Sequence, residues 1–246
     1  MTIVHSEWMP SIREMDRGLA ICAIGDVHGR ADLLEEMHAS IAGEFERISP
    51  AVAHCIHLGD LIDRGPESVR ALELAMHGIS GAANCTLIGN HEHRLLHLLD
   101  TPNAMMMERW LKHGGREFFE ELGIDPHGSW ERAVSDRLGE RMMRWLKSLP
   151  LSLRIGKLLF VHAGIDVEVP IAQQTAETLT WIREPWTSSD GPYEDGLAVI
   201  HGHTPVAKVA LDNRHRIDLD TGACETGMLS ALLIHGDKMK LLQTSG

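Results

Sequence analysis

The sequence predicts an α/β protein in which polar turns at the ends of successive strands form one site. Three observations support this prediction. Apolar runs alternate with helical periodicity through the first hundred residues, a helical stretch fills residues 102–149, and strand signals return from residue 157. Several apolar runs end in clusters of Gly, Asp, His and Asn, and open α/β sheets bind ligands at the carboxyl ends of their strands.

The first part of the chain predicts three strand–turn–helix units in succession. After the first strand, apolar residues from Leu34 to Ile48 fall at spacings of three and four, which is typical of an amphipathic helix. Pro66 suits the first turn of the second helix. Such repeated units favour a largely parallel sheet. The predicted strands are Leu19–Ile24, His54–Leu58 and Asn84–Ile88, and the predicted helices span about 34–48, 66–77 and 92–99.

The middle and the end of the chain differ in pattern. One apolar stripe in the middle is typical of helix packing, with a cofactor-binding helix as the alternative; its members are Trp130, Val134, Leu138, Met142, Trp145 and Leu149. The later predicted strands are Lys157–Val161, Leu197–Ile200, Arg216–Leu219, Leu229–Ile234 and Met239–Leu242. Short turns join the last three, so we expect an antiparallel meander. No internal repeat or linker is visible, which predicts one domain, residues 1–246, with a core of about 19–244.

Composition limits the function classes. The 246 residues are 43% hydrophobic and 24% charged, which are ordinary values for a globular protein and exclude disorder as the main state. The net charge of −12 argues against broad binding to nucleic acid or anionic membrane. Four widely spaced cysteines form no C-x-x-C pair, as expected of buried thiols in a reducing compartment. With no signal-peptide pattern and no membrane-length apolar run, the sequence predicts a cytoplasmic protein.

Five of the turns combine glycine with acidic, amide or imidazole side chains. They are Gly25-Asp26-Val27-His28-Gly29, Gly59-Asp60-Leu61-Ile62-Asp63-Arg64-Gly65, Gly89-Asn90-His91-Glu92, Val161-His162-Ala163-Gly164 and His201-Gly202-His203-Thr204. Each motif alone has an ordinary explanation, such as a capped turn beside a surface histidine. Five of them in order, each after an apolar run, favour a dinuclear metal site. Oxygen and imidazole donors without thiolate suit Mn, Fe or Zn.

The set GDVHG, GDLIDRG, GNHE, HAG and HGHT resembles, in order and spacing, the signature of the metal-dependent phosphoprotein phosphatases of the calcineurin-like phosphoesterase superfamily. The resemblance covers about residues 19–235 and implies two mixed β-sheets sandwiched between helices. It also implies two metal ions, with Mn favoured over Fe and Zn, and makes Asp60 the bridge between them. The implied ligands are Asp26, His28 and Asp60 for the first metal, and Asp60, Asn90, His162 and His203 for the second. His201 would have a structural role.

The resemblance further implies a catalytic pair and two phosphate-binding arginines. His91 would protonate the leaving alkoxide. Asp63 would orient the His91 imidazole and raise its pKa. Their alternative roles are a turn residue and a helix-entry cap. Arg64 would bind phosphoryl oxygens. Arg183, in the segment W-I-R-E, resembles a second phosphate-binding arginine, with a surface ion pair to Glu184 as the alternative.

Two further features complete the set of candidate residues. Arg94 follows His91 by three residues and is a candidate to face the site. The segment Asp220-Thr221-Gly222-Ala223 resembles the late D-T-G turn of the family, for which we expect a structural role.

The favoured function is a metal-dependent phosphomonoesterase of the serine/threonine protein phosphatase type, acting on a phosphorylated protein or a small phosphoester. It would use in-line attack by a metal-bridging hydroxide. The alternative is a symmetrical bis(5'-nucleosyl)-tetraphosphatase, a subfamily that typically has Ala in place of Asp63 and GNHD in place of GNHE. That substrate needs a longer groove with base-stacking aromatics, and only five Phe and Tyr occur here. We therefore expect phosphopeptides to be better substrates than diadenosine tetraphosphate. A catalytically silent metal-binding adaptor is the candidate from a different class, and the filled ligand positions argue against it.

Overall fold

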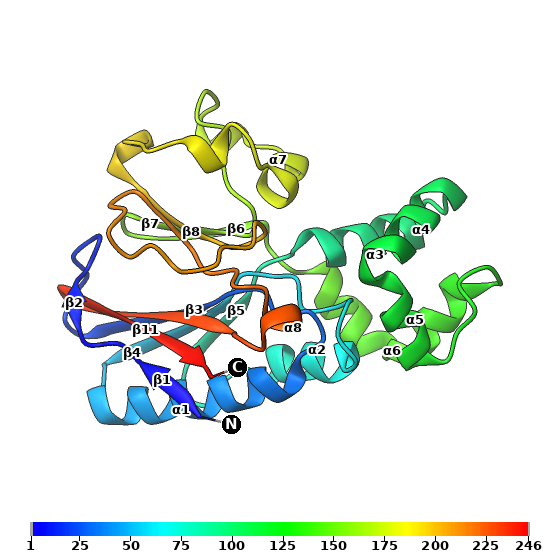
Figure 1. Ribbon diagram of the computed structural model, residues 1–246, viewed down its shortest axis with the longest axis horizontal. Helices are drawn as coiled ribbons and strands as arrows, with labels where there is room; N and C mark the ends of the chain where they lie inside the picture. Colours follow the sequence, from blue (N-terminus) through cyan, green and yellow to red (C-terminus); the bar gives the residue numbers. More distant parts are fainter. Residues whose placement is uncertain (1, 246) are drawn as a thin grey trace.

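The computed structural model describes residues 2–245 and contains two stacked β-sheets with helices on their outer sides (Figure 1). The larger sheet has the order β1-β11-β10-β3-β4-β5, with β2 paired to β11, and the smaller has the order β6-β7-β8-β9. Both sheets mix parallel and antiparallel pairs, as expected.

The strands are β1 (Ile3–His5), β2 (Met9–Pro10), β3 (Leu19–Ile24), β4 (Val52–His57), β5 (Ala83–Thr86), β6 (Ser152–Ile155), β7 (Leu158–Val161), β8 (Ala198–His201), β9 (Arg216–Asp218), β10 (Ser230–His235) and β11 (Lys238–Thr244). The α-helices are α1 (Ala31–Ile48), α2 (Ser68–His77), α3 (Asn90–Asp100), α4 (Ala104–Trp110), α5 (Arg116–Leu122), α6 (Trp130–Lys147), α7 (Ala176–Trp181) and α8 (Ala223–Thr226).

The predicted parallel units exist and set the position of the site. In the larger sheet β3 pairs parallel with β4, and β4 with β5, so that the last residue of β3, Ile24, lies opposite His57, and His57 opposite Thr86. In the smaller sheet β7 pairs parallel with β8. The turns that follow these strands therefore leave the two sheets at their carboxyl edges.

The predicted three-strand meander is wrong. β9 pairs parallel with β8 in the smaller sheet, whereas β10 and β11 form an antiparallel hairpin in the larger sheet around Gly236. The segment between β9 and β10 crosses from one sheet to the other. A short connection shows that two strands are close, but it does not show that they pair. Sequence analysis did not predict β1, β2 and β6, which are short strands near sheet edges.

The apolar run of β3 is buried on both faces. Ile21 and Ala23 pack between the two sheets, and Cys22 and Ile24 pack against the helices, as the two-residue period of a strand requires. The core on the helix side continues into α4, α5 and α6, where Trp110, Phe118, Phe119 and Trp130 form edge-to-face contacts. No helix within residues 2–245 combines the length and apolarity needed to cross a bilayer.

Candidate metal centre and phosphate cleft

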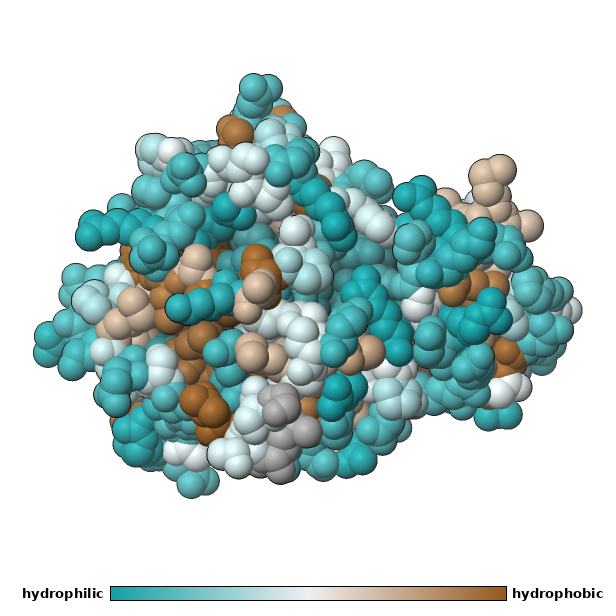
Figure 2. Space-filling view, in the orientation of Figure 1, coloured by the Kyte–Doolittle hydropathy of each residue, from teal (hydrophilic) through white to brown (hydrophobic). Residues whose placement is uncertain are grey.

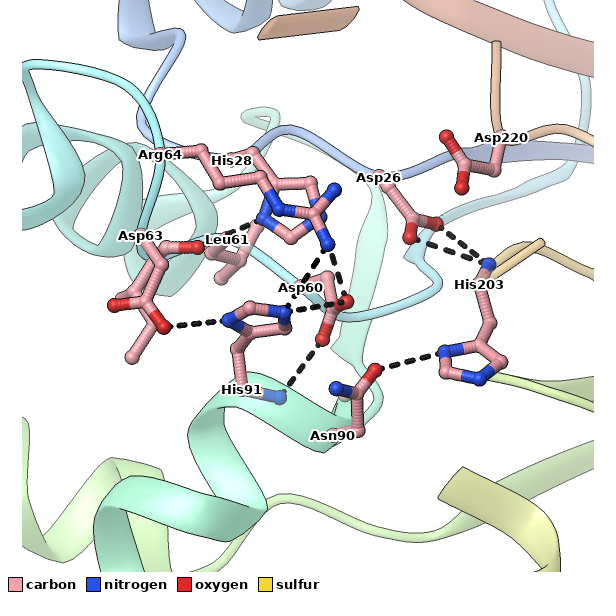
Figure 3. Close-up of polar contacts among 12 residues, drawn as sticks. Asp26, His28, Asp60, Leu61, Asp63, Arg64, Asn90, His91, His203 and Asp220 are labelled. Carbon is pink, nitrogen blue, oxygen red and sulfur yellow. Dashed lines mark hydrogen bonds and ion pairs between the residues drawn. The ribbon is translucent and has the colours of Figure 1, made fainter. Parts of the chain in front are cut away.

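The five predicted motifs meet at the carboxyl edges of the two sheets, and Figure 3 shows those that carry Asp26, Asp60, Asn90 and His203. The loop after β3 carries Asp26 and His28, and the loop after β4 carries Asp60, Asp63 and Arg64. Asn90 and His91 open helix α3 after β5, and His162 and His203 follow β7 and β8. Parallel pairing within each sheet accounts for this convergence, because it directs successive turns to one edge.

The backbone of these loops is strained. Among the described residues, seven residues other than glycine have a positive φ, and five of them belong to the site: His28, Asp60, Asp63, Arg64 and His203. Each such conformation costs of the order of 1–3 kcal/mol and persists only where the surroundings enforce it. Here the loops after β3 and β4 touch through their glycines, since a Cβ on Gly29 would lie 2.7 Å from the carbonyl of Gly65. The strain therefore lies where functional side chains are placed.

Asp60 lies between two groups of possible metal ligands. Its Oδ2 is 3.5 Å from His28 Nε2 and 3.9 Å from His91 Nε2. Its Oδ1 is 3.4 Å from His162 Nε2 and accepts a hydrogen bond from the His91 amide. The two groups, His28–Asp60–His91 and Asp60–His162–His203, are fully buried and share only Asp60. One carboxylate with an oxygen toward each group is suitably placed to bridge two ions.

Asn90 contacts the second group directly, and Asp26 lies beside it. The Asn90 Oδ1 is 3.0 Å from His162 Nε2 and 2.8 Å from His203 Nδ1. The Asp26 carboxylate accepts the His203 amide through both oxygens, each at 3.2 Å. The structure thus brings all six predicted ligand residues into one cluster.

The chemistry of these donors fits divalent cations. Burial, and then the nearby carboxylates of Asp220 and Asp60, raise the pKa of Asp26 well above its usual value. Bound cations would offset this repulsion and stabilise the carboxylates. The donors are oxygen and imidazole without thiolate, a set that Mn, Fe and Zn accept.

His91 also contacts a second acidic residue. Its Nδ1 lies 2.5 Å from Asp63 Oδ2, and the same oxygen accepts a hydrogen bond from the indole N–H of Trp110. Burial favours neutral His91, but the carboxylates of Asp60 and Asp63 outweigh it and raise the His91 pKa. Glu67, not Asp63, occupies the N-cap position of α2, and the Glu121 carboxylate accepts hydrogen bonds from the Ser68 and Val69 amides. A histidine held between a carboxylate and an open cleft is well placed to transfer a proton.

Sequence analysis missed the contact of Trp110 with Asp63. Trp110 ends α4 and is fully buried against Phe118 and Phe119. Its N–H reaches Asp63 from 47 residues away in the sequence. No local motif signals such a contact.

Four arginines line a cavity of about 410 Å³ in front of the buried cluster: Arg64, Arg94, Arg109 and Arg183. Arg64 reaches to 3.4 Å from His91 Nε2, and Arg183 to 3.4 Å from His203 Nε2. Glu184 accepts hydrogen bonds from Thr187 and Ser188. Among the described residues it therefore does not form the alternative ion pair with Arg183. The cavity can therefore bind several phosphoryl oxygens.

Glu92 is a buried residue that sequence analysis used only as part of a motif. Its carboxylate accepts the amides of Gly89, Asp60, Leu61 and Ile62, at distances between 2.7 and 3.1 Å. This fixes the loop that carries Asp60. The signal that could have found it is the capping-box position, three residues after Gly89.

The late turn and His201 lie beside the cluster. Asp220 accepts the Gly222 amide, as a structural turn residue does, and burial raises its pKa to about 6. Burial likewise raises the pKa of Asp218 to about 8. His201 is outside both ligand groups; its Nδ1 contacts the Gly202 carbonyl and its ring packs on Trp186.

A third possible ligand group lies on the helix side of β4. It comprises His38, Cys55 and His57. The two histidines hydrogen bond to each other at 2.7 Å, and His57 also contacts Thr86, so core hydrogen bonding accounts for their polar atoms.

Comparison with known proteins identifies the family. The model of the calcineurin-like phosphoesterases matches residues 19–226. The chain belongs to this family. It is therefore a metallophosphoesterase, and the family and the ligand groups together imply divalent metal ions.

Two relatives of this phosphoesterase carry related names. The asymmetrical bis(5'-nucleosyl)-tetraphosphatase PrpE of Halalkalibacterium halodurans is 28% identical over 233 residues, which cover 85% of this chain and 87% of that protein. The symmetrical bis(5'-nucleosyl)-tetraphosphatase of Methylococcus capsulatus is 35% identical over 147 residues, which cover 60% of this chain and 44% of that one.

Solved structures agree on the fold. A candidate diadenosine tetraphosphatase superposes with a TM-score of 0.66 at 20% identity, covering 92% of this phosphoesterase and 94% of that chain. A cold-active protein-tyrosine phosphatase from Shewanella superposes with a TM-score of 0.57 at 15% identity, covering 93% and 80%. The α/β fold with two mixed sheets and flanking helices is thus confirmed.

Proposed function

We propose that this phosphoesterase hydrolyses dinucleoside tetraphosphates, the substrate class of the symmetrical tetraphosphatase that sequence analysis ranked second. The observation that carries the proposal is that a second cavity adjoins the one in front of the metal centre. The cavity of about 410 Å³ adjoins another of about 620 Å³, since Arg94, Arg109 and Trp181 line both. A monoester needs only the metal centre with Arg64 and Arg183, whereas further cations along a cleft suit a chain of phosphates.

Asymmetrical cleavage is the form we favour. The relatives named asymmetrical match most of this chain and most of their own length, whereas the symmetrical relative from Methylococcus matches 44% of its own. The products would be a nucleoside triphosphate and a nucleoside monophosphate. Water oxygen bonds to one terminal phosphorus of the chain, the neighbouring phosphoanhydride bond breaks, and the bridging oxygen leaves with its electron pair.

The residues of the site divide this work. Asp26, His28, Asp60, Asn90, His162 and His203 would hold two divalent cations, with Mn favoured. Such ions supply positive charge beside the phosphate and lower the pKa of bound water. Arg64 and Arg183 bind the phosphoryl oxygens, and His91, oriented by Asp63, donates a proton to the leaving oxygen.

A second candidate, hydrolysis of a phosphomonoester, is favoured by the Asp63–His91 contact of 2.5 Å. An alkoxide leaving group needs a proton more than a phosphate leaving group does, and this pair is arranged to supply one.

Kinetics with Mn on diadenosine tetraphosphate and on a phosphoserine peptide test the proposal, with chromatography of the nucleotide products. We expect kcat/KM to favour the dinucleotide by about tenfold or more, close to 1.4 kcal/mol of transition-state binding. ATP and AMP are the expected products, and two ADP would indicate symmetrical cleavage. A tenfold preference for the peptide would favour the monoesterase. Absence of turnover with both metals bound would contradict both and favour the adaptor.

A further inference from the structure

The wall of the cleft concentrates positive charge in an acidic protein. The net charge of the protein is −12. Nevertheless, the described residues that line the cavity of about 410 Å³, here called the first cavity, include four arginines and no carboxylate. Arg94 is half-buried, and burial together with the neighbouring Arg109 lowers its pKa. Packing like charges together is unfavourable unless an anion joins them. The first cavity therefore has the character of a polyanion site larger than one phosphate.

The adjoining cavity of about 620 Å³, here called the second cavity, has a different lining. Beyond the shared Arg94, Arg109 and Trp181 it is bordered by two methionines, one carboxylate and three neutral hydrogen-bonding side chains: Met105, Met106, Glu177, His93, His97 and Asn103. Met105 is 83% exposed, and Figure 2 shows a light-brown, weakly hydrophobic projection where α4 stands in Figure 1. A carboxylate here disfavours further phosphates, whereas it can accept hydrogen bonds from an amino or hydroxyl group. Flexible methionines pack well on flat rings. This lining suits an uncharged base and sugar.

Trp181 marks the border between the two cavities. It ends α7, which stands opposite α3 and α4 in Figure 1, and its ring centre lies 6.1 Å from that of His203. The Arg94 guanidinium lies over this ring at 4.4 Å. An arginine stacked on an aromatic face keeps its N–H groups free in the plane, where they can bind phosphate oxygens.

We propose that the second cavity is the nucleoside subsite of a nucleoside polyphosphate. In it, Arg94 and Arg109 hold the phosphates beyond the reacting one, and the base lies against Met105 and Met106 beside Trp181. The inference rests on the proposed function and extends it, since it names the residues that separate a nucleotide substrate from a short phosphoester.

The test uses the Mn-loaded enzyme with p-nitrophenyl phosphate as reporter and with ATP, tripolyphosphate and AMP as inhibitors. In the wild-type enzyme ATP should inhibit more strongly than AMP. Arg109→Ala should raise the inhibition constants of both ATP and tripolyphosphate about tenfold, the loss expected for one charge-assisted hydrogen bond. Met105→Ser should raise the constant of ATP about threefold and change that of tripolyphosphate less. Arg141→Ala, on an exposed part of α6, is the control.

The same variants are then assayed on diadenosine tetraphosphate. Arg109→Ala should lower kcat/KM for the dinucleotide about tenfold more than for the aryl phosphate. Equal losses on both substrates, or ATP no stronger than AMP, would overturn the subsite while leaving dinucleotide cleavage intact. Conversely, a wild-type enzyme that never cleaves the dinucleotide, yet binds ATP through Arg109 and Met105, would refute the proposed function and retain the subsite.

Discussion

The metal centre and the walls of the cleft are built on opposite principles. Residues of the centre, such as Asp60 and His203, are buried and sit on strained backbone. The walls come from α3, α4 and α7, where Arg109 and Met105 stand exposed on regular helices. The comparison indicates that the reaction chemistry depends on a rigid set of loops, whereas substrate choice depends on helix surfaces that can change with little cost to the fold.

The largest expected effect is at the centre. Asp60→Asn keeps the shape of the side chain but removes the charge that both ligand groups share. We expect loss of metal from both sites and a fall in kcat of about 10⁴-fold, since several kcal/mol of charge stabilisation depend on the ions. Metal analysis by mass spectrometry, with p-nitrophenyl phosphate kinetics, measures both quantities. Asp195→Asn, an exposed carboxylate paired with Arg154, is the control. Full occupancy of two ions in Asp60→Asn would refute the bridging role.

The next effect distinguishes proton transfer from metal binding within the centre. His91→Asn should lower kcat by about 10²–10³-fold for poor leaving groups, within the range of a general acid. The leaving groups of aryl phosphates need less protonation, so kcat for these substrates should fall by a smaller factor. If both substrate types lose the same factor while the metal content is unchanged, His91 does not act as the acid.

A third prediction concerns the rigidity of the loops. Glu92→Gln leaves one side-chain oxygen to accept the four amides that the carboxylate now accepts. We expect the free energy of unfolding to fall by about 2–4 kcal/mol, because buried amides would lose their charged acceptor. Urea denaturation measures it, and Glu120→Gln, at an exposed position on α5, should change it by less than about 0.5 kcal/mol. A Glu92 variant as stable as this control would show that the loop does not depend on the carboxylate.

The same contrast explains what the sequence could predict. The loops could be located because their ligands and glycines are neighbours along the chain, as in Gly25–Gly29, and because parallel strands direct such turns to one edge. The hydrogen bond of Trp110 to Asp63 and the stacking of Arg94 on Trp181 could not be predicted from the sequence. They depend on how α4 and α7 pack against α3, and no short-range pattern encodes that packing. For the same reason β9 was assigned to the wrong partner.

The smallest effect tests the junction of the two regions. Gly114 lies between α4 and α5 at a φ of 109°, and its carbonyl accepts the Arg64 amide at 2.9 Å. A Cβ at this position would collide with the Arg64 side chain. Gly114→Ala should therefore lower the free energy of unfolding by about 1–3 kcal/mol and, by displacing Arg64, raise KM about threefold or more.

Gly123→Ala is the matched control for this junction. Gly123 also has a positive φ, 65°, but a Cβ there meets no heavy atom within 4 Å. It should cost about 1 kcal/mol of backbone strain and leave KM as in the wild-type enzyme. Urea denaturation and initial-rate kinetics on both variants separate strain from displacement. A KM that changes only in Gly114→Ala would show that the segment from α4 to α5 positions Arg64. An equal KM in the two variants would mean that the loop after β4 holds Arg64 without help from the segment from α4 to α5. That segment would then contribute only the walls of the cleft.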